Sequence, residues 1–201
     1  MGNYIFYHCA TINDYYERFI NTFSKIEESG LINDVEKIFI TINGQSSCDF
    51  AINKKIDTWQ KNQTHPNESI TINRIRHFCL ENKDCNILYL HGKGVTKPKN
   101  QNVNCWIEIM EHFLITKYKT CLNDLKSFDC VGSLFKNDGN PHFSGNFWWS
   151  RSDYISTLPD CPDEYFAPEM WLLKNNKLNV KSYFNSSVDF YSQSIEKDLY
   201  Y

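Results

Sequence analysis

The stretch Asn86-Ile87-Leu88-Tyr89-Leu90-His91-Gly92-Lys93-Gly94 decides the fold of this chain. Its apolar run, residues 87–90, is typical of a buried strand, and it breaks off into two basic side chains flanked by glycine. In open α/β sheets, ligands bind beyond the carboxyl ends of the strands, so the break places His91 and Lys93 where a ligand would lie. The alternative interpretation is a solvated turn that only connects a strand to a loop.

Strand and helix patterns alternate on both sides of this stretch. Aromatic and β-branched runs predict strands at residues 4–8, 37–42, 130–135, 142–150 and 180–184. Apolar residues at helical spacing predict helices at residues 14–31, 69–81 (with Ser69 as its cap), 106–125, 152–158 and 167–173, and a short helix at 52–59 within a polar loop. Residues 187–201 are polar and show no clear pattern. This alternation predicts one α/β domain whose mostly parallel central sheet has helices on both faces.

The composition is that of a globular protein, and it excludes several function classes. The 201 residues are 41% hydrophobic and 22% charged, with a formal net charge of −3. A negative balance argues against a nucleic-acid-binding protein, which usually carries a basic stripe. No run of about 18 apolar residues occurs, so we expect no membrane span. The N-terminus lacks the basic and apolar regions of a signal peptide.

Eight cysteines are scattered at irregular spacing, and no CxxC pair occurs. A disulfide framework, a zinc ribbon and a redox motif are therefore not expected. Several cysteines lie inside apolar runs, which favours buried thiols in a reducing compartment, and we predict a cytoplasmic protein. A zinc or thiol protein is the alternative interpretation. The sequence leaves the oligomeric state open.

Polar or glycine-bearing turns follow the first three predicted strands. These turns are His8-Cys9-Ala10-Thr11, Asn43-Gly44 and His91-Gly92-Lys93-Gly94. In a doubly wound sheet these strand ends converge on one crevice, so three weak signals become one site hypothesis.

The segment His142-Phe143-Ser144-Gly145-Asn146-Phe147-Trp148-Trp149 is dense in aromatic and polar residues. Gly145 inside a strand pattern indicates close approach by a ligand or another backbone. The period of two would place Ser144, Asn146 and Trp148 on one face, where an indole can stack on a sugar ring. The alternative interpretation is a core strand with a bulge.

A carboxylate and an arginine complete the set of candidates. Glu169, in Pro168-Glu169-Met170-Trp171, is either a site carboxylate or an acidic residue that favours a helix N-terminus electrostatically. Arg74 and Arg76 lie two positions apart and do not share a helix face. We expect one of them, Arg76, to reach a phosphate, although both are also consistent with a surface position.

In this order the motifs resemble those of a family of GT-A-type glycosyltransferases of bacteria, algae and large DNA viruses. The resemblance covers about residues 4 to 173, and its most specific elements are His-x-Lys-Gly at 91–94 and Ser-Gly-Asn-Phe-Trp-Trp at 144–149. It implies a single GT-A-like domain over residues 1–201. The nucleotide-binding part would take up about residues 1–95, and the acceptor- and sugar-binding part about residues 96–185.

The resemblance also implies an activity and a role for each motif. The activity is transfer of a sugar from a UDP- or GDP-linked donor to a hydroxyl acceptor on a glycan or protein; the alternative is a non-catalytic sugar- or nucleotide-binding module on the same fold. The implied catalytic residues are Glu169, Lys93 and His91. The implied nucleotide- and diphosphate-binding residues are His8, Ala10, Thr11, Asn43, Arg76, Gly92 and Gly94. The implied sugar- and acceptor-binding residues are His142, Ser144, Gly145, Asn146 and Trp148.

The usual metal of such enzymes is not expected here. In GT-A enzymes this strand ordinarily ends in Asp-x-Asp, and the acidic pair holds Mn²⁺ or Mg²⁺ on the donor diphosphate. This sequence has His91-Gly92-Lys93 in that place. A lysine repels a divalent cation but can neutralise a diphosphate directly. We therefore expect stabilisation of the leaving group without a metal ligand.

Overall fold

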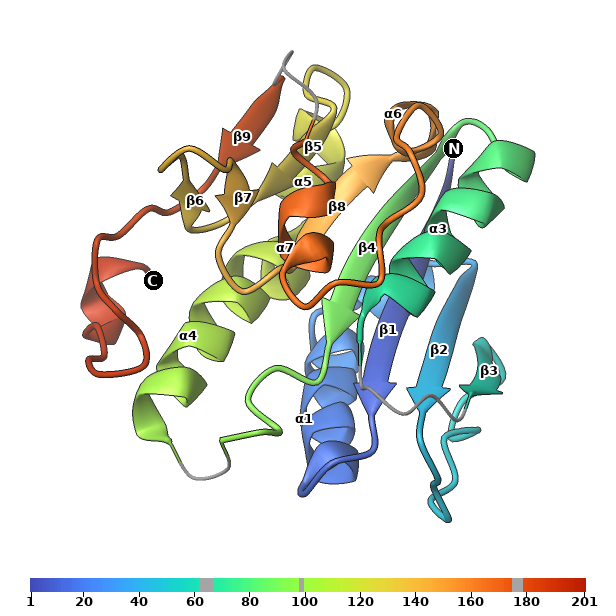
Figure 1. The fold of residues 1–201 in the computed structure, drawn as a ribbon, viewed down its shortest axis with the longest axis horizontal. Helices are drawn as coiled ribbons and strands as arrows, with labels where there is room; N and C mark the ends of the chain where they lie inside the picture. The colour runs from blue at the N-terminus through green and yellow to red at the C-terminus, as the bar shows by residue number, and fades with distance from the viewer. Residues whose placement is uncertain (62–66, 98–99, 175–178) are drawn as a thin grey trace.

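A seven-stranded sheet forms the centre of the computed structural model, which describes residues 1–61, 67–97, 100–174 and 179–201 (Figure 1). The strands of this sheet are β1 (Gly2–Ala10), β2 (Lys37–Asn43), β3 (Ile56–Lys61), β4 (Cys85–His91), β5 (Cys130–Gly132), β8 (Trp148–Arg151) and β9 (Val180–Ser182). They lie in the order β3-β2-β1-β4-β8-β5-β9, and only β8 runs antiparallel to its neighbours. The predicted α/β class with a mostly parallel sheet is confirmed.

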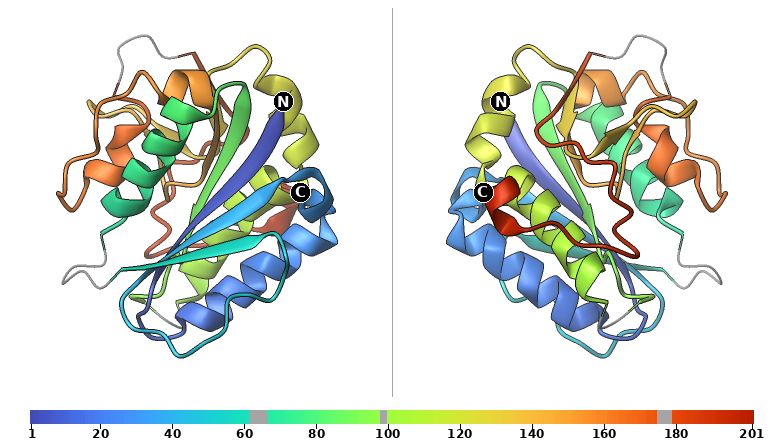
Figure 2. Two further views of the ribbon diagram at one scale, coloured as in Figure 1. Left: turned by 90° about the vertical axis from the view of Figure 1, so that its right-hand side faces the viewer. Right: turned by 90° about the vertical axis from the view of Figure 1, so that its left-hand side faces the viewer.

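Helices cover both faces of the sheet (Figure 2). On one face lie α1 (Tyr15–Glu28), α4 (Gln101–Glu111), the π-helical turn η1 (His112–Thr116) and α5 (Tyr118–Asp124); on the other lie α3 (Ser69–Glu81), α6 (Ser152–Ile155) and α7 (Ala167–Trp171). The remaining short elements are α2 (Leu31–Asp34), the hairpin strands β6 (Phe135–Lys136) and β7 (His142–Phe143), and η2 (Lys197–Leu199). Among the residues described, no helix is both long and apolar enough to cross a bilayer.

The strand residues divide between two apolar clusters, one on each face. Leu88 and Leu90 of β4 pack with α1 and α4, whereas Ile87 and Tyr89 pack with α3 and α7. This division follows from the two-residue period of a strand, and it explains why the run 87–90 is apolar throughout.

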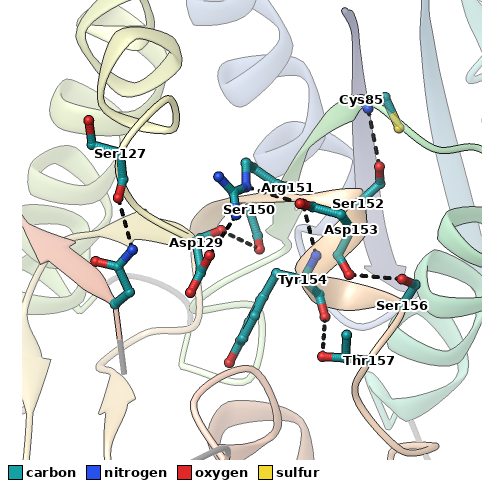
Figure 3. Close-up of polar contacts among 11 residues, drawn as sticks. Cys85, Ser127, Asp129, Ser150, Arg151, Ser152, Asp153, Tyr154, Ser156 and Thr157 are labelled. Atoms are coloured by element: carbon teal, nitrogen blue, oxygen red, sulfur yellow. Dashed lines mark hydrogen bonds and ion pairs between the residues drawn. The ribbon is translucent and has the colours of Figure 1, made fainter. Parts of the chain in front are cut away.

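Polar contacts fix the antiparallel strand β8 and the turn into α6 (Figure 3). Arg151 pairs with Asp129 at 2.7 Å and with Asp153 at 3.1 Å. The Ser152 hydroxyl accepts a hydrogen bond from the backbone N–H of Cys85 at 3.1 Å. The first contact ties the end of β8 to the start of β5, and the last ties it to the start of β4.

Five local predictions are wrong. The predicted strand 130–135 is two strands in different sheets, β5 and β6, separated at Leu134, whose φ is 58°. The predicted helix at 52–59 is instead the parallel edge strand β3, because residues 56–61 pair with β2. The predicted strand 142–150 is two strands separated by a turn in which Gly145 and Asn146 have φ of 93° and 57°. The predicted helix 106–125 begins earlier and contains the π-helical turn η1. The N-cap of α3 is Glu68, whereas Ser69 is its first helical residue.

Candidate functional site

A cavity of about 540 Å³ opens at the carboxyl ends of β1 and β4. The strand order reverses between these two strands, since β2 and β3 lie on one side of β1 and β4 lies on the other. Ligands of doubly wound sheets bind at such a switch point. The cavity is lined by His8, Ala10, Ile12, Asn67, Glu68, residues 91–97, Val103, Asn146, Asp163, Tyr165, Phe166, Pro168, Glu169 and Tyr191.

The structure brings eight of the predicted site residues together on this wall: His8, Ala10, His91, Gly92, Lys93, Gly94, Asn146 and Glu169. His8 and His91 are register partners at the ends of β1 and β4, which explains why two segments far apart in the sequence meet here. The His8 ring shares a hydrogen bond of 2.8 Å with the Thr71 hydroxyl of α3, so β1, β4 and α3 all reach the cavity.

Seven other predicted site residues are not among those that line the cavity: Thr11, Asn43, Arg76, His142, Ser144, Gly145 and Trp148. The Arg76 guanidinium donates to the carbonyl of Leu158 at 2.5 Å and pairs with Asp160 at 2.9 Å. Trp148 is 1% exposed, and its ring lies in the apolar cluster under α3 and α7 because β8 is an inner strand of the sheet with helices on both faces.

The remaining members of that group have local partners. The Thr11 hydroxyl donates to the carbonyl oxygen of Asn43 at 3.3 Å, which ties the end of β1 to the end of β2. His142 lies in the β6–β7 hairpin, where its Nδ1 is 2.8 Å from the carbonyl oxygen of Asn140. The backbone carbonyl of Ser144 accepts from the Trp106 indole N–H at 3.2 Å. These contacts hold backbone in place near the site.

Lys93 is the strongest candidate for binding an anion. Its Nζ lies 3.8 Å from the centre of the Trp106 ring, and among the described residues it makes no hydrogen bond and no ion pair. Burial lowers the pKa of Lys93, the positive charge of Lys97 adds to that effect, and Glu169 and Glu68 oppose it. An anion in the cavity would favour the charged form of this lysine.

His91 has both ring nitrogens directed at protein groups. Nε2 lies 2.9 Å from the carbonyl oxygen of Gly145, and since a carbonyl only accepts, the proton of the neutral ring resides on Nε2. Nδ1 then faces the Glu68 carboxylate at 3.6 Å. Burial lowers the pKa of His91 and Lys93 lowers it further, whereas Glu68 raises it. His91 therefore links β4 to the Gly145 turn.

Glu68 is the site residue that sequence reasoning missed. It occupies the N-cap of α3 but makes no capping hydrogen bond with its side chain; instead it accepts from the Tyr89 hydroxyl at 2.7 Å and from Asn146 Nδ2 at 2.8 Å. Burial by itself would raise the pKa of this carboxyl, but His91, His8 and the two hydrogen bonds together lower it. An acidic residue just before a helix resembles an ordinary terminal charge, and its partners are 21 to 78 positions away.

Glu169 of α7 contacts the same turn. Its Oε1 accepts the backbone N–H of Gly145 at 2.9 Å, while no described residue donates to Oε2. Glu68, His91, Gly145 and Glu169 thus form a continuous chain of polar contacts beside the cavity. This arrangement holds one carboxylate oxygen ready to receive a hydroxyl group.

The side chains at the end of β4 do not match a divalent-cation site. Lys93 takes the second position of the His91-Gly92-Lys93 triplet, and an ammonium group cannot ligate a metal ion. No cluster of three or more His, Cys, Asp or Glu side chains with metal-binding placement occurs in the described ranges.

Comparisons with known proteins identify a family. The model of the family described as "Domain of unknown function (DUF8361)" matches residues 21–191. The chain belongs to this family. A comparison with curated proteins gives no match for this DUF8361 chain.

Two solved structures are similar to the DUF8361 chain. The crystal structure of 4-diphosphocytidyl-2C-methyl-D-erythritol synthase shows a TM-score of 0.49 at 11% identity, with 92% of this chain and 89% of that chain covered. The crystal structure of Rv0371c from Mycobacterium tuberculosis H37Rv shows a TM-score of 0.47 at 9% identity, with 94% and 90% covered.

Proposed function

We propose that this protein transfers a sugar from a nucleotide-diphosphate donor, UDP- or GDP-linked, to a hydroxyl acceptor on a glycan or protein. The observation that carries the proposal is Lys93. Its ammonium group lies against an indole in a cavity at the switch point of the sheet, and no described residue makes a hydrogen bond or ion pair with it. A diphosphate in the cavity would supply the direct anionic contact that this lysine does not make with the described residues.

The proposed reaction assigns a role to the charged side chains of the cavity. When the bond between the anomeric carbon and the diphosphate oxygen breaks, negative charge develops on the leaving diphosphate, and Lys93 with its neighbour Lys97 stabilises it. Glu169 orients the acceptor hydroxyl through Oε2 and takes its proton as the new bond to the anomeric carbon forms. His91 acts through the Gly145 turn, which it holds against Glu169.

A divalent cation has no place in this scheme, because a lysine stands where the acidic pair of a metal-dependent enzyme would be. We therefore propose that transfer proceeds in excess EDTA at the rate measured with Mn²⁺. Complete loss of activity under EDTA would contradict metal-independent transfer. Donor binding is tested by a separate measurement.

Titration calorimetry with UDP- and GDP-sugars tests the function. Because a charge-assisted hydrogen bond contributes about 1.5–3 kcal/mol, Lys93→Ala should weaken donor binding roughly 10- to 150-fold. The matched control is Lys61→Ala, since Lys61 also lies over an indole, 4.5 Å from the Trp59 ring centre, but outside the cavity. This control should bind the donor as the wild type does.

Three outcomes would overturn the proposal. If wild-type protein binds none of the nucleotide sugars, or if Lys93→Ala binds them unchanged, the assignment of a diphosphate to Lys93 fails. If the donor binds but is neither hydrolysed nor transferred in the presence of glycan acceptors, the protein is a non-catalytic binding module on this fold.

A further inference from the structure

Three large aromatic side chains are exposed at the mouth of the cavity. Tyr165 is 87% exposed, Phe166 is 65% exposed and Tyr191 is 48% exposed, and all three line the cavity. Leaving so much aromatic surface in water forgoes the free energy of burial, and exposed aromatic groups gathered at one place typically mark a binding site.

These aromatic residues come from opposite faces of the sheet. Tyr165 and Phe166 precede α7, on the face that α3 covers, and their rings meet edge to face at 4.8 Å between centres. Tyr191 belongs to the C-terminal segment that packs on α4, where its ring meets Trp106 at 5.4 Å. Burial raises the pKa of Tyr191, and Glu169 and Tyr165 raise it further, which indicates that these three groups lie within electrostatic reach of one another.

We propose that Tyr165, Phe166 and Tyr191 form an acceptor subsite that receives the pyranose ring of a glycan. The proposal rests on the proposed function and specifies its acceptor. The apolar C–H face of the sugar packs on the aromatic rings, and its hydroxyl groups point to the carboxylate of Glu169. The subsite takes over the stacking role that the sequence had suggested for Trp148, which the fold buries.

The charges around the mouth favour a sugar over a phosphate or a nucleotide at this position. Asp163 and Glu169 flank Tyr165 and Phe166 in the chain and line the same cavity, and carboxylates accept hydroxyl groups but repel phosphates. The cations Lys93 and Lys97 lie on the loop after β4, and the apolar side chains of Ala10 and Ile12 lie at the end of β1 and just beyond it. We therefore assign the strand ends, with their lysines, to the nucleotide and the aromatic rim to the acceptor. Glu169, whose charge reaches both Lys93 and Tyr191, lies between the two.

Saturation-transfer NMR with methyl glycosides of glucose, galactose, mannose and N-acetylglucosamine tests the subsite, with UDP or GDP present to occupy the donor side. We expect saturation to be transferred from the wild-type protein to at least one glycoside. We expect the double variant Tyr165→Ala/Phe166→Ala to bind that glycoside roughly tenfold more weakly. Tyr165→Phe keeps the ring and should retain binding. Tyr201→Ala, which removes an aromatic group that is 68% exposed outside the cavity, is the matched control.

The donor affinity of the double variant separates this inference from the proposed function. We expect calorimetry to give the wild-type donor Kd. A donor Kd that weakens in parallel would assign the aromatic rim to the nucleotide base and overturn the proposal. The proposal is also overturned if no glycoside receives saturation from a wild-type protein that binds donor. The same holds if the wild type and the double variant give equal saturation-transfer signals. Absence of donor binding in the wild type would contradict the proposed function instead.

Discussion

At the residue scale, Gly145 connects the two carboxylates of the site through its backbone. Its carbonyl accepts from His91 and its N–H donates to Glu169, both at 2.9 Å. A β-carbon at this position would lie 2.5 Å from Met110 Sδ and 2.8 Å from Trp106 Nε1, and φ is +93°. Glycine is therefore required here for conformation and for space together.

Gly145→Ala should destabilise the fold and remove donor binding. Gly139→Ala is the matched control, because Gly139 also has a positive φ, +99°, but nothing within 4 Å of the added carbon. Left-handed backbone costs a residue with a side chain about 1–2 kcal/mol, which both variants share. Overpacking adds about 1–3 kcal/mol at Gly145 alone. Urea denaturation measures the difference, and equal losses in the two variants would contradict the packing at Gly145.

The sequence predicted the residues whose position depends on a strand end and missed those that depend on distant partners. His91 and Lys93 could be placed because an apolar run stops before them. Glu68 could not, since its significance comes from Tyr89 and Asn146, which only the folded chain brings to it. Trp148 was misplaced because its strand, β8, lies inside the sheet with helices on both faces, which only the strand order reveals.

At the element scale, the π-helical turn η1 holds a histidine in an unusual setting. His112 is 5% exposed, and neither ring nitrogen has a hydrogen-bond partner within the described part of the chain. Its ring packs against Phe113, Tyr200 and Tyr201. Burial lowers the pKa of His112, and the charge of Lys117 adds to that effect.

His112→Leu should stabilise the protein at low pH. Below a pH of about 6.5 this histidine is protonated in the unfolded chain, whereas in the folded chain its lowered pKa keeps it neutral. The unfolded state then binds more protons, so the stability of the fold decreases as the pH is lowered. The leucine variant lacks this loss. As the pH is lowered from 8 to 5, the free energy of unfolding of the variant should therefore increase relative to that of the wild type. The increase should be on the order of 1 kcal/mol for each unit by which folding lowers the pKa of His112. Parallel pH profiles in urea denaturation would refute this.

One helix irregularity and the type of one edge element could not be predicted from local sequence. Helical spacing continues through residues 106–125, so the sequence showed no break at His112–Thr116, although the chain there makes a π-helical turn. The edge strand β3 was predicted as a helix because it lies in a polar segment and is mostly exposed; only pairing with β2 makes it a strand. Tertiary pairing overrides local propensity in such segments.

At the scale of the whole molecule, the alternation of strands and helices was sufficient to predict the architecture. The C-terminal segment was not predictable, because its position depends on contacts with α4. The Lys197 ammonium pairs with Glu108 at 3.0 Å, and the carbonyl oxygen of Tyr191 accepts from Asn100 Nδ2 at 3.3 Å. These contacts bring Tyr191 to the cavity. No pattern in the sequence therefore predicted that the C-terminal segment contributes to the site.

The thiols report on the integrity of both apolar clusters. All eight cysteines are free, and the six apart from Cys48 and Cys105 are buried. Burial raises the pKa of Cys9, Cys121 and Cys161 to about 12. We expect Ellman's reagent to modify at most two thiols in the native protein and all eight in denaturant without reductant. Fewer than eight in denaturant would indicate disulfides, and rapid native reaction of more than two would contradict the packing.

Because the cavity lies between the two helical layers, ligand binding and folding of the chain are thermodynamically coupled. Its walls run from His8 to Tyr191 and include segments from both faces of the sheet, so unfolding of either face removes part of the cavity. A ligand present at 100 times its Kd therefore adds about 2.7 kcal/mol to the stability of the native state. The melting temperature of the chain becomes a measure of which small molecules it accepts.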